Sequence, residues 1–297
     1  MRPIDLMIVG AQKAGTTSLL MYLGEHPNIV RHAQKEFAYF LTPNEYKKGY
    51  ESAVKKYYQT ESISDSDIIL AKSASLYSDE EALKRLYAHN PKCEIVIILR
   101  NPVDRAYSSY LMEKNAGSGS FGFDEIPRLL SHKSSWEYQF FIDYGIYIQH
   151  LRILYSIFPK EQVQVIFYED LKDNAPQICK TIFQKIGVRS DFMPNTKIKH
   201  NVTQKQRSVT YAKMVAKALS NKSILRKLLL PFTTIHQAHK YGNAVRGLNK
   251  SKEFHQPMST GSRMILSEFF KPYNEELSRL LGKDLSNWNY SNEKQER

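Results

Sequence analysis

A glycine-containing loop lies between an apolar run and a helical pattern near the amino end of the chain. The sequence reads MIVGAQKAGTTSLLMYLG from Met7. An apolar run, a glycine turn and a helical pattern in this order predict a strand over residues 5–9 and a helix over residues 17–24. Such a loop presents backbone N–H groups and the positive end of a helix dipole, both of which favour phosphate. The stretch therefore predicts an α/β fold with an anion site at its first turn.

The loop differs from the phosphate loop of nucleotide triphosphatases in the position of its lysine. A Walker loop has Gly, four residues, Gly, Lys and then Ser or Thr, so that the lysine reaches the outer phosphates. Gly10 and Gly15 have this separation, but Thr16 stands in place of the lysine, and Lys13 lies inside the loop. The pattern predicts a cradle for a 5′-phosphate that requires no metal. Lys13 is expected to project across the mouth of the loop toward the group attached to that phosphate.

A second strand and helix repeat this arrangement in CEIVIILRNPVDRAYSSYLM. The apolar run 94–99 predicts a central strand, and Pro102 suits the first turn of a helix through Met112. Arg100 follows the strand, and Ser108 lies two turns into the helix. Ligands of open α/β sheets bind at the carboxyl ends of the strands, so Arg100 and Ser108 are expected to grip a second phosphate. Two separate monophosphate sites indicate a nucleotide phosphorylated at both ends.

The remaining periodicity extends the same fold class. A third strand is predicted from Val163, with helical patterns over 144–158 before it and 175–186 after it. Alternating strands and helices favour one central parallel sheet flanked by helices, and a chain of 297 residues is read as a single domain over 1–297. A final helix is expected over 263–281, with a break or kink at Pro272. Residues 205–230 are read as basic helix within a mainly helical carboxyl-terminal segment.

Composition and charge restrict the classes of protein that fit. Only two cysteines occur and no stretch is apolar enough to span a bilayer, so we expect a bacterial-style cytoplasmic protein. The net charge of +12 is concentrated: residues 197–252 contain 13 Lys and Arg and no Asp or Glu, whereas the rest holds 29 basic and 30 acidic residues. Such a block attracts anions, although a solvated basic face is an equally good interpretation.

Taken together, the motifs resemble those of the sulfotransferases that use 3′-phosphoadenosine 5′-phosphosulfate, in the branch of the heparan sulfate enzymes and their bacterial relatives. GAQKAGTTSL is similar to that family's 5′-phosphosulfate loop, and RNPVDRAYSSY to its 3′-phosphate motif. KEFAYF, AKSASLY, YEDL and the closing LSNW also match. The resemblance implies a P-loop-like sulfotransferase fold and the donor 3′-phosphoadenosine 5′-phosphosulfate without a metal. It further implies a glycan or small-molecule acceptor carrying a hydroxyl or amine.

The resemblance also implies roles for individual residues. Glu36 matches the family's catalytic base and is expected to lie buried among the aromatic residues of KEFAYF, while Lys13 and Lys72 would neutralise the leaving phosphate and the transferring group. Ala38 departs from some relatives, which have a histidine there. His26 and His32 are expected to be structural or exposed. The residues expected to hold the donor are Gly10, Gln12, Lys13, Ala14, Gly15, Thr16, Thr17, Ser18, Arg100, Ser108, Arg246, Lys250 and Lys252.

Two other functions are compatible with parts of the sequence. An ATP-dependent phosphotransferase would use the same type of loop, but neither a Walker lysine nor an evident magnesium carboxylate accompanies it. A nucleic-acid-binding protein could use the 197–252 segment, but no helix-turn-helix, zinc or aromatic RNA-binding signature supports this. The sequence does not identify the acceptor or show whether an oxygen or a nitrogen of the acceptor attacks. It also does not give the oligomeric state.

Overall fold

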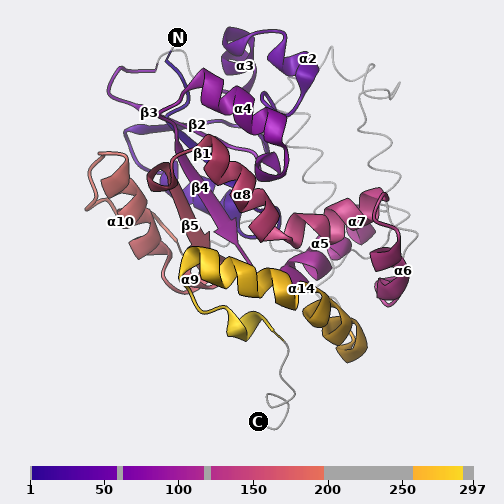
Figure 1. Cartoon of the computed structure of the whole chain (residues 1–297). Coiled ribbons are helices and arrows are strands. Elements are labelled where there is room, and N and C mark those ends of the chain that lie inside the picture. The colour runs from indigo at the N-terminus through magenta and orange to yellow at the C-terminus, as the bar shows by residue number, and fades with distance from the viewer. Residues whose placement is uncertain (1, 59–62, 117–121, 197–256, 290–297) are drawn as a thin grey trace.

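The computed structural model describes residues 2–58, 63–116, 122–196 and 257–289. Within them a five-stranded parallel sheet has the order β2-β3-β1-β4-β5, with helices on both faces (Figure 1). The strands are β1 (Leu6–Gly10), β2 (Ile29–Arg31), β3 (Ile68–Lys72), β4 (Glu94–Leu99) and β5 (Val163–Phe167). This confirms the predicted fold class. Because the strands are parallel, the turns that follow them meet at one edge, which we call the carboxyl edge.

The helices follow the strands in the predicted alternation. They are α1 (Thr16–Leu23), α2 (Pro43–Tyr46), α3 (Tyr50–Tyr57), α4 (Glu80–His89), α5 (Pro102–Ala116), α6 (Ile126–Ser131), α7 (Trp136–Phe141), α8 (Tyr147–Ile157), α9 (Tyr168–Asp173), α10 (Ala175–Lys185) and α14 (Thr260–Leu281). Short 3₁₀ turns lie at Leu76–Ser78, Asp143–Gly145, Lys160–Gln162 and Ser286–Trp288. No helix in these ranges combines the length and hydrophobicity that a bilayer crossing requires.

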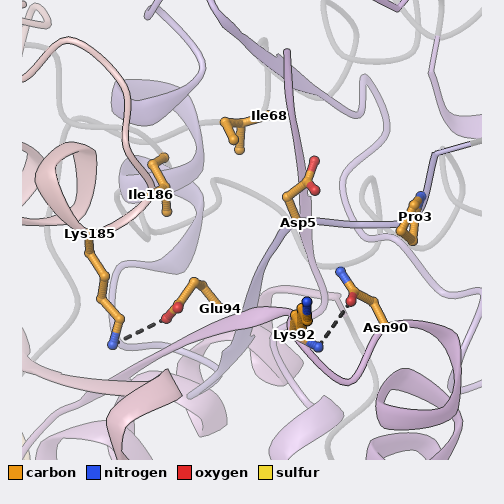
Figure 2. Close-up of a pocket in the computed structure, with 8 residues that line it drawn as sticks. All are labelled: Pro3, Asp5, Ile68, Asn90, Lys92, Glu94, Lys185 and Ile186. Carbon is orange, nitrogen blue, oxygen red and sulfur yellow. Dashed lines mark hydrogen bonds and ion pairs between the residues drawn. The ribbon is translucent and has the colours of Figure 1, made fainter. Parts of the chain in front are cut away.

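The opposite, amino edge of the sheet carries a pocket where β1, β3 and β4 begin (Figure 2). Its charged groups are largely paired: Lys185 Nζ lies 3.2 Å from Glu94 Oε2, and Asp5 Oδ2 accepts the Ile69 N–H at 2.8 Å. Burial, the largest influence, raises the pKa of Asp5, while the Ile69 hydrogen bond and Arg2 oppose it. Lys92 also borders this pocket.

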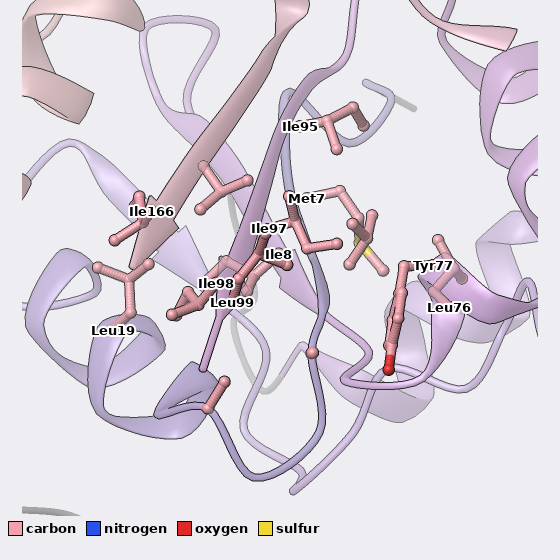
Figure 3. Packing of buried hydrophobic residues seen from close by; sticks show 14 of the residues in the cluster. Met7, Ile8, Leu19, Leu76, Tyr77, Ile95, Ile97, Ile98, Leu99 and Ile166 are labelled. Atoms are coloured by element: carbon pink, nitrogen blue, oxygen red, sulfur yellow. The ribbon is translucent and has the colours of Figure 1, made fainter. Parts of the chain in front are cut away.

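The core fills both faces of the two central strands. Side chains alternate along β4, so Ile98 faces Leu19 of α1 while Ile97 faces Tyr77 on the opposite side (Figure 3). All residues of β1 are buried, and so are the five residues of β4 after Glu94. Strands buried on both faces read as continuous apolar runs, which is why these two strands were recognisable in the sequence.

Two strands were missed by the sequence analysis. β2 has three residues, too few for a periodic signal, and β3 has the sequence IILAK, which ends in a buried lysine. Of the predicted break or kink at Pro272, the break does not occur, because α14 continues through this residue. Its apolar face, with Leu266, Phe270 and Leu277 buried, spans both sides of the proline. Packing of this face offsets the lost backbone hydrogen bond.

Candidate functional site

The first loop has the backbone shape of an anion cradle. Lys13 and Gly15 both have positive φ, at 71° and 90°, a conformation that is uncommon for a residue with a side chain. Gly15 is the N-cap of α1. The Ala14 N–H donates to the Ala11 carbonyl at 3.1 Å, so this amide is engaged within the loop instead of facing the predicted phosphate. Within the described residues the N–H groups of Gly15, Thr16 and Thr17 have no backbone acceptor.

The second motif contacts the first directly. Arg100 Nη1 donates to the Lys13 carbonyl at 3.0 Å, and its guanidinium lies 4.6 Å from the Tyr168 ring centroid. The adjacent α5 approaches the loop through Ser109, whose Oγ lies 3.5 Å from Gln12 Oε1. Ser108 is partly exposed on the same helix. The structure therefore brings the two predicted phosphate motifs together at the carboxyl edge.

Lys13 lies in a positively charged environment. Burial is the largest influence on its amine, followed by repulsion from Lys35, Arg100 and Arg105, and together they lower its pKa to about 8. Glu113 acts in the opposite direction. Cations crowded around a half-buried amine disfavour the charged form, and a bound anion would relieve this repulsion. The loop is therefore suited electrostatically to a negatively charged ligand.

Glu36 and Lys72 form an ion pair beside the loop. Lys72 Nζ lies 2.7 Å from Glu36 Oε1 and donates to Thr17 Oγ1 at 3.4 Å. Lys72 is fully buried, and burial lowers the pKa of its amine although the Glu36 carboxylate opposes this shift. Glu36 Oε2 accepts the Ala74 N–H at 2.9 Å. The base, cation and threonine hydroxyl predicted from separate stretches are thus adjacent.

One expectation about Glu36 is wrong. Its side chain is 38% exposed, whereas Phe37, Tyr39 and Phe40 are buried. KEFAYF is not a strand or a helix, so the orientation of Glu36 could not be inferred from a periodic pattern. The carboxylate faces Lys72 and retains access to solvent, which a base acting on an external acceptor needs.

His26 and His32 were expected to be structural or exposed, and both are buried. His26 accepts the Asn28 N–H through Nδ1 at 3.1 Å, and its Nε2 lies 3.1 Å from the Arg189 carbonyl oxygen. His32 accepts the Lys72 N–H through Nε2 at 3.1 Å. The hydrogen bond from the Lys72 N–H links His32 to the Glu36–Lys72 pair. The sequence analysis did not predict this link.

Other quoted motifs also converge on this edge. Tyr168 and Leu171, from YEDL, pack beside Gly15 closely enough that an added Cβ there would lie 3.4 Å and 3.2 Å from their side chains. Tyr77, from AKSASLY, packs against Gly10, where an added Cβ would approach its ring to 2.3 Å. The Trp288 carbonyl of LSNW accepts a hydrogen bond from Asn101 Nδ2 at 3.2 Å. These motifs therefore support the phosphate loops from behind.

The sequence analysis missed Arg105 as a member of the site. Its side chain is fully buried, and Nη2 donates to the Phe140 and Phe141 carbonyls at 2.8 and 2.7 Å. It fixes α7 against α5 and adds positive charge near Lys13. The available signal was its position on the inner face of the second motif's helix, three residues before Ser108. The predicted donor-closing residues Arg246, Lys250 and Lys252, and the 197–252 segment, lie outside the described residues.

The described His, Cys, Asp and Glu side chains form no cluster of three or more suited to a metal ion. The groups that the site brings together are cations, hydroxyls and backbone N–H groups around one carboxylate. This set of donors fits phosphate or sulfate ester oxygens.

Comparison with known proteins agrees with this chemistry. The family model described as "Sulfotransferase domain" matches residues 3–272. The chain is 27% identical over 297 residues to human bifunctional heparan sulfate N-deacetylase/N-sulfotransferase 3 and 28% identical over 298 residues to the mouse type 1 enzyme. Each alignment covers 95% of this chain but 30% of the relative, so the chain spans less than a third of the length of these proteins.

The fold has a counterpart among solved structures. The crystal structure of a sulfotransferase from Alicyclobacillus acidocaldarius superposes with a TM-score of 0.66 at 22% identity, covering 97% of this chain and 99% of that one. This likeness confirms the fold predicted from the sequence. With the family model matching most of its length, the chain belongs to the sulfotransferase domain family.

Proposed function

We propose that the protein transfers a sulfuryl group from 3′-phosphoadenosine 5′-phosphosulfate to a hydroxyl or amine of a carbohydrate or small natural-product acceptor. The observation that carries the proposal is the contact chain from Glu36 through Lys72 to Thr17, at 2.7 Å and 3.4 Å. It joins a candidate base to the loop that would hold the donor's 5′-phosphosulfate. The names of the heparan sulfate relatives support a carbohydrate acceptor.

The donor would lie across the two motifs. The N–H groups and hydroxyls at the start of α1 would bind the 5′-phosphate, assisted by the helix dipole. Arg100 and Ser108 would bind the 3′-phosphate, and the Arg100–Lys13 hydrogen bond would hold the two sites at a fixed separation. Gln12 lies at the junction through its contact with Ser109. Such a division suits one nucleotide with a phosphate at each end.

Transfer would proceed by in-line displacement at sulfur. The acceptor oxygen or nitrogen forms a new bond to sulfur while the bond from sulfur to the bridging oxygen breaks. The electron pair of that bond stays on the 5′-phosphate, where Lys13 neutralises the charge, and Glu36 takes the acceptor's proton. Lys72 balances the sulfuryl oxygens. Positioning and fixed charges then supply the rate acceleration.

The proposed location is the cytoplasm. Cys93 and Cys179 are free and buried, and burial raises the pKa of the Cys179 thiol to about 12. Burial likewise raises the pKa of the Cys93 thiol. Thiols in this state are poor nucleophiles. Free thiols are usual in a reducing compartment such as the cytoplasm, where disulfides are rare.

The decisive experiment compares ligands and then measures transfer. Thermal unfolding is followed with 3′,5′-bisphosphoadenosine without magnesium, and separately with magnesium ATP. Stabilisation by the bisphosphate alone is expected. Stabilisation only by magnesium ATP would support a phosphotransferase, and a response to neither would contradict the proposed donor site. Labelled donor is then supplied with N-desulfated heparin and a panel of neutral glycans and phenols, and radioactive product identifies the acceptor class.

A further inference from the structure

The backbone around Lys72 departs from regular strand pairing. β2 pairs with β3 in parallel through Ile29, Val30 and Arg31, and the last matched pair joins Arg31 to Leu70. The β2 strand ends at Arg31, yet β3 continues to Lys72. A strand whose neighbour has ended leaves N–H and C=O groups without ladder partners, which is costly inside a protein.

The side chain of His32 fills this place. Its Nε2 accepts the Lys72 N–H at 3.1 Å, in the position that a carbonyl of a continued neighbouring strand would occupy. The Lys72 carbonyl accepts the Phe37 N–H at 2.8 Å. Both backbone groups of Lys72 are therefore held by residues 32–37, which also carry Glu36. A side-chain acceptor lets this segment leave the sheet and turn back toward Lys72.

The environment of His32 keeps it an acceptor. The ring is fully buried and lies 6.0 Å from the Phe37 ring and 6.4 Å from the Tyr58 ring. Burial, and then the charges of Lys72 and Arg31, lower the pKa of His32 to about 3. At neutral pH the imidazole is uncharged, and Nε2 accepts a hydrogen bond only when the ring proton is on Nδ1.

We infer that His32 is a positioning residue that holds Lys72 and Glu36 in register for sulfuryl transfer by replacing the missing β2 hydrogen-bond acceptor. The inference rests on the proposed function for the reaction, but its geometric part does not. The hydrogen bond to His32 comes from the Lys72 backbone, whereas the catalytic groups are the side chains of Lys72 and Glu36. Loss of the acceptor should therefore impair turnover without removing any group that binds the donor.

The first test uses the unmodified protein. Two-dimensional ¹⁵N NMR of the histidine rings distinguishes a ring nitrogen that carries hydrogen from one that does not. His32 is expected to be neutral with an unprotonated Nε2. A protonated Nε2 would overturn the inference whether or not any acceptor has been found, so this result is independent of the proposed function.

The second test compares His32→Gln with His32→Asn and His32→Phe. The glutamine carbonyl can reach the position of Nε2, whereas asparagine is too short and phenylalanine has no acceptor. Because a misplacement of about 1 Å can cost about 100-fold in rate, Asn and Phe should lower kcat roughly 10- to 100-fold, and Gln should restore most of it. The dissociation constant of 3′,5′-bisphosphoadenosine should stay within about threefold in all three, since its contacts are unchanged.

His26→Asn and His26→Phe provide the matched control. His26 is equally buried and hydrogen-bonded to the backbone, but it packs against Phe183 and Phe192 away from the pair. Its variants should lower the melting temperature and leave kcat unchanged. Equal kcat in wild type and His32→Asn would overturn the inference, as would equal loss in His32→Gln and His32→Asn. If His32→Phe does not fold, the Gln and Asn pair and the ring spectrum still decide.

Discussion

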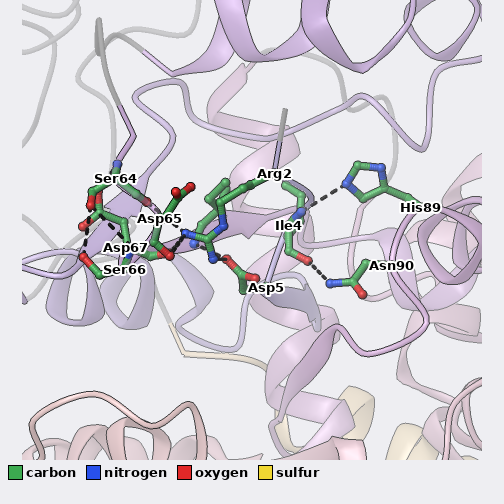
Figure 4. Close-up of polar contacts among 10 residues, drawn as sticks. Arg2, Ile4, Asp5, Ser64, Asp65, Ser66, Asp67, His89 and Asn90 are labelled. Atoms are coloured by element: carbon green, nitrogen blue, oxygen red, sulfur yellow. Dashed lines mark hydrogen bonds and ion pairs between the residues drawn. The ribbon is translucent and has the colours of Figure 1, made fainter.

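The two edges of the sheet hold similar residues but combine them differently. At the amino edge, Arg2 donates to the carbonyls of Ser64, Asp65 and Asp67 and contacts Asp5 (Figure 4), and Lys185 pairs with Glu94. At the carboxyl edge, three other cations repel Lys13, and Glu36 forms an ion pair with Lys72. Paired charges stabilise the amino edge, whereas excess positive charge at the carboxyl edge favours the binding of an anion. A surplus of one sign, more than the presence of charged residues, marks the site.

The largest expected effect separates two glutamate–lysine pairs. Glu36→Gln should lower kcat about 100- to 10,000-fold, the usual range for loss of a general base. Binding of 3′,5′-bisphosphoadenosine should change little, because Gln retains the shape of the side chain. Glu94→Gln, in the pair at the amino edge, should retain wild-type kcat. Initial rates with labelled donor and calorimetric binding measure both, and wild-type turnover by Glu36→Gln would remove this residue as the base.

Lys13 should be the next most sensitive position. Lys13→Ala should lower kcat about 100- to 1000-fold, as expected when one preorganised charge at a leaving group is lost. Lys92→Ala at the amino-edge pocket is the control and should have no effect on transfer. Steady-state kinetics at saturating donor distinguishes the two variants. Equal rates for Lys13→Ala and wild type would show that the loop lysine does not act on the leaving phosphate.

The pH dependence of ligand binding sharpens the same contrast. The pKa of Lys13 is lowered to about 8, so its charge is present below that pH and is lost as the pH rises through it. Affinity for 3′,5′-bisphosphoadenosine should therefore fall between about pH 8 and pH 10. Lys13→Arg keeps its charge throughout and should flatten this decline. Calorimetric titrations at several pH values test this; an identical decline in Lys13→Arg would assign it to another group.

Arg100→Ala should have a smaller effect, on affinity. Loss of a charged hydrogen-bond donor to a phosphate costs about 1.5–3 kcal/mol, or roughly 10- to 100-fold in the dissociation constant of 3′,5′-bisphosphoadenosine. The same change should lower affinity for adenosine 5′-phosphate much less if Arg100 binds the 3′-phosphate, because only its hydrogen bond to the Lys13 carbonyl is then lost. Arg2→Ala, which removes the carbonyl contacts at the amino edge, should lower the melting temperature without changing either affinity. Calorimetry with both nucleotides and thermal unfolding measure these outcomes.

Two glycine substitutions should change the stability of the fold in opposite directions. An added Cβ at Gly10 would lie 2.3 Å from the Tyr77 ring, whereas nothing lies within 4 Å of one at Gly261. Gly10→Ala should therefore destabilise the fold by about 1–3 kcal/mol through overpacking, and Gly261→Ala in α14 should stabilise it by up to about 1 kcal/mol. Urea unfolding gives both values; a neutral Gly10→Ala would mean that Tyr77 shifts easily.

Local signals predicted the parts of the molecule that depend on neighbouring residues. The run EIVIIL became β4 with the predicted bounds, and α5 began at the predicted Pro102, because continuous hydrophobicity and proline at a helix start act locally. The third predicted strand likewise begins at Val163. β2 and β3 could not be found in this way, since a three-residue strand and a strand ending in lysine depend on their neighbours for pairing and burial.

For the site, the sequence by itself determined which chemical groups are present and that two loops would meet, because parallel strands must bring their following turns to one edge. The tertiary structure alone decided which groups touch: that Glu36 pairs with Lys72, that Arg100 bonds the Lys13 carbonyl, and that His32 takes the place of a missing strand. The physical reason is that these contacts join segments separated by 36 to 87 positions. The distances between such segments are set by how the helices and strands pack, which no local pattern specifies.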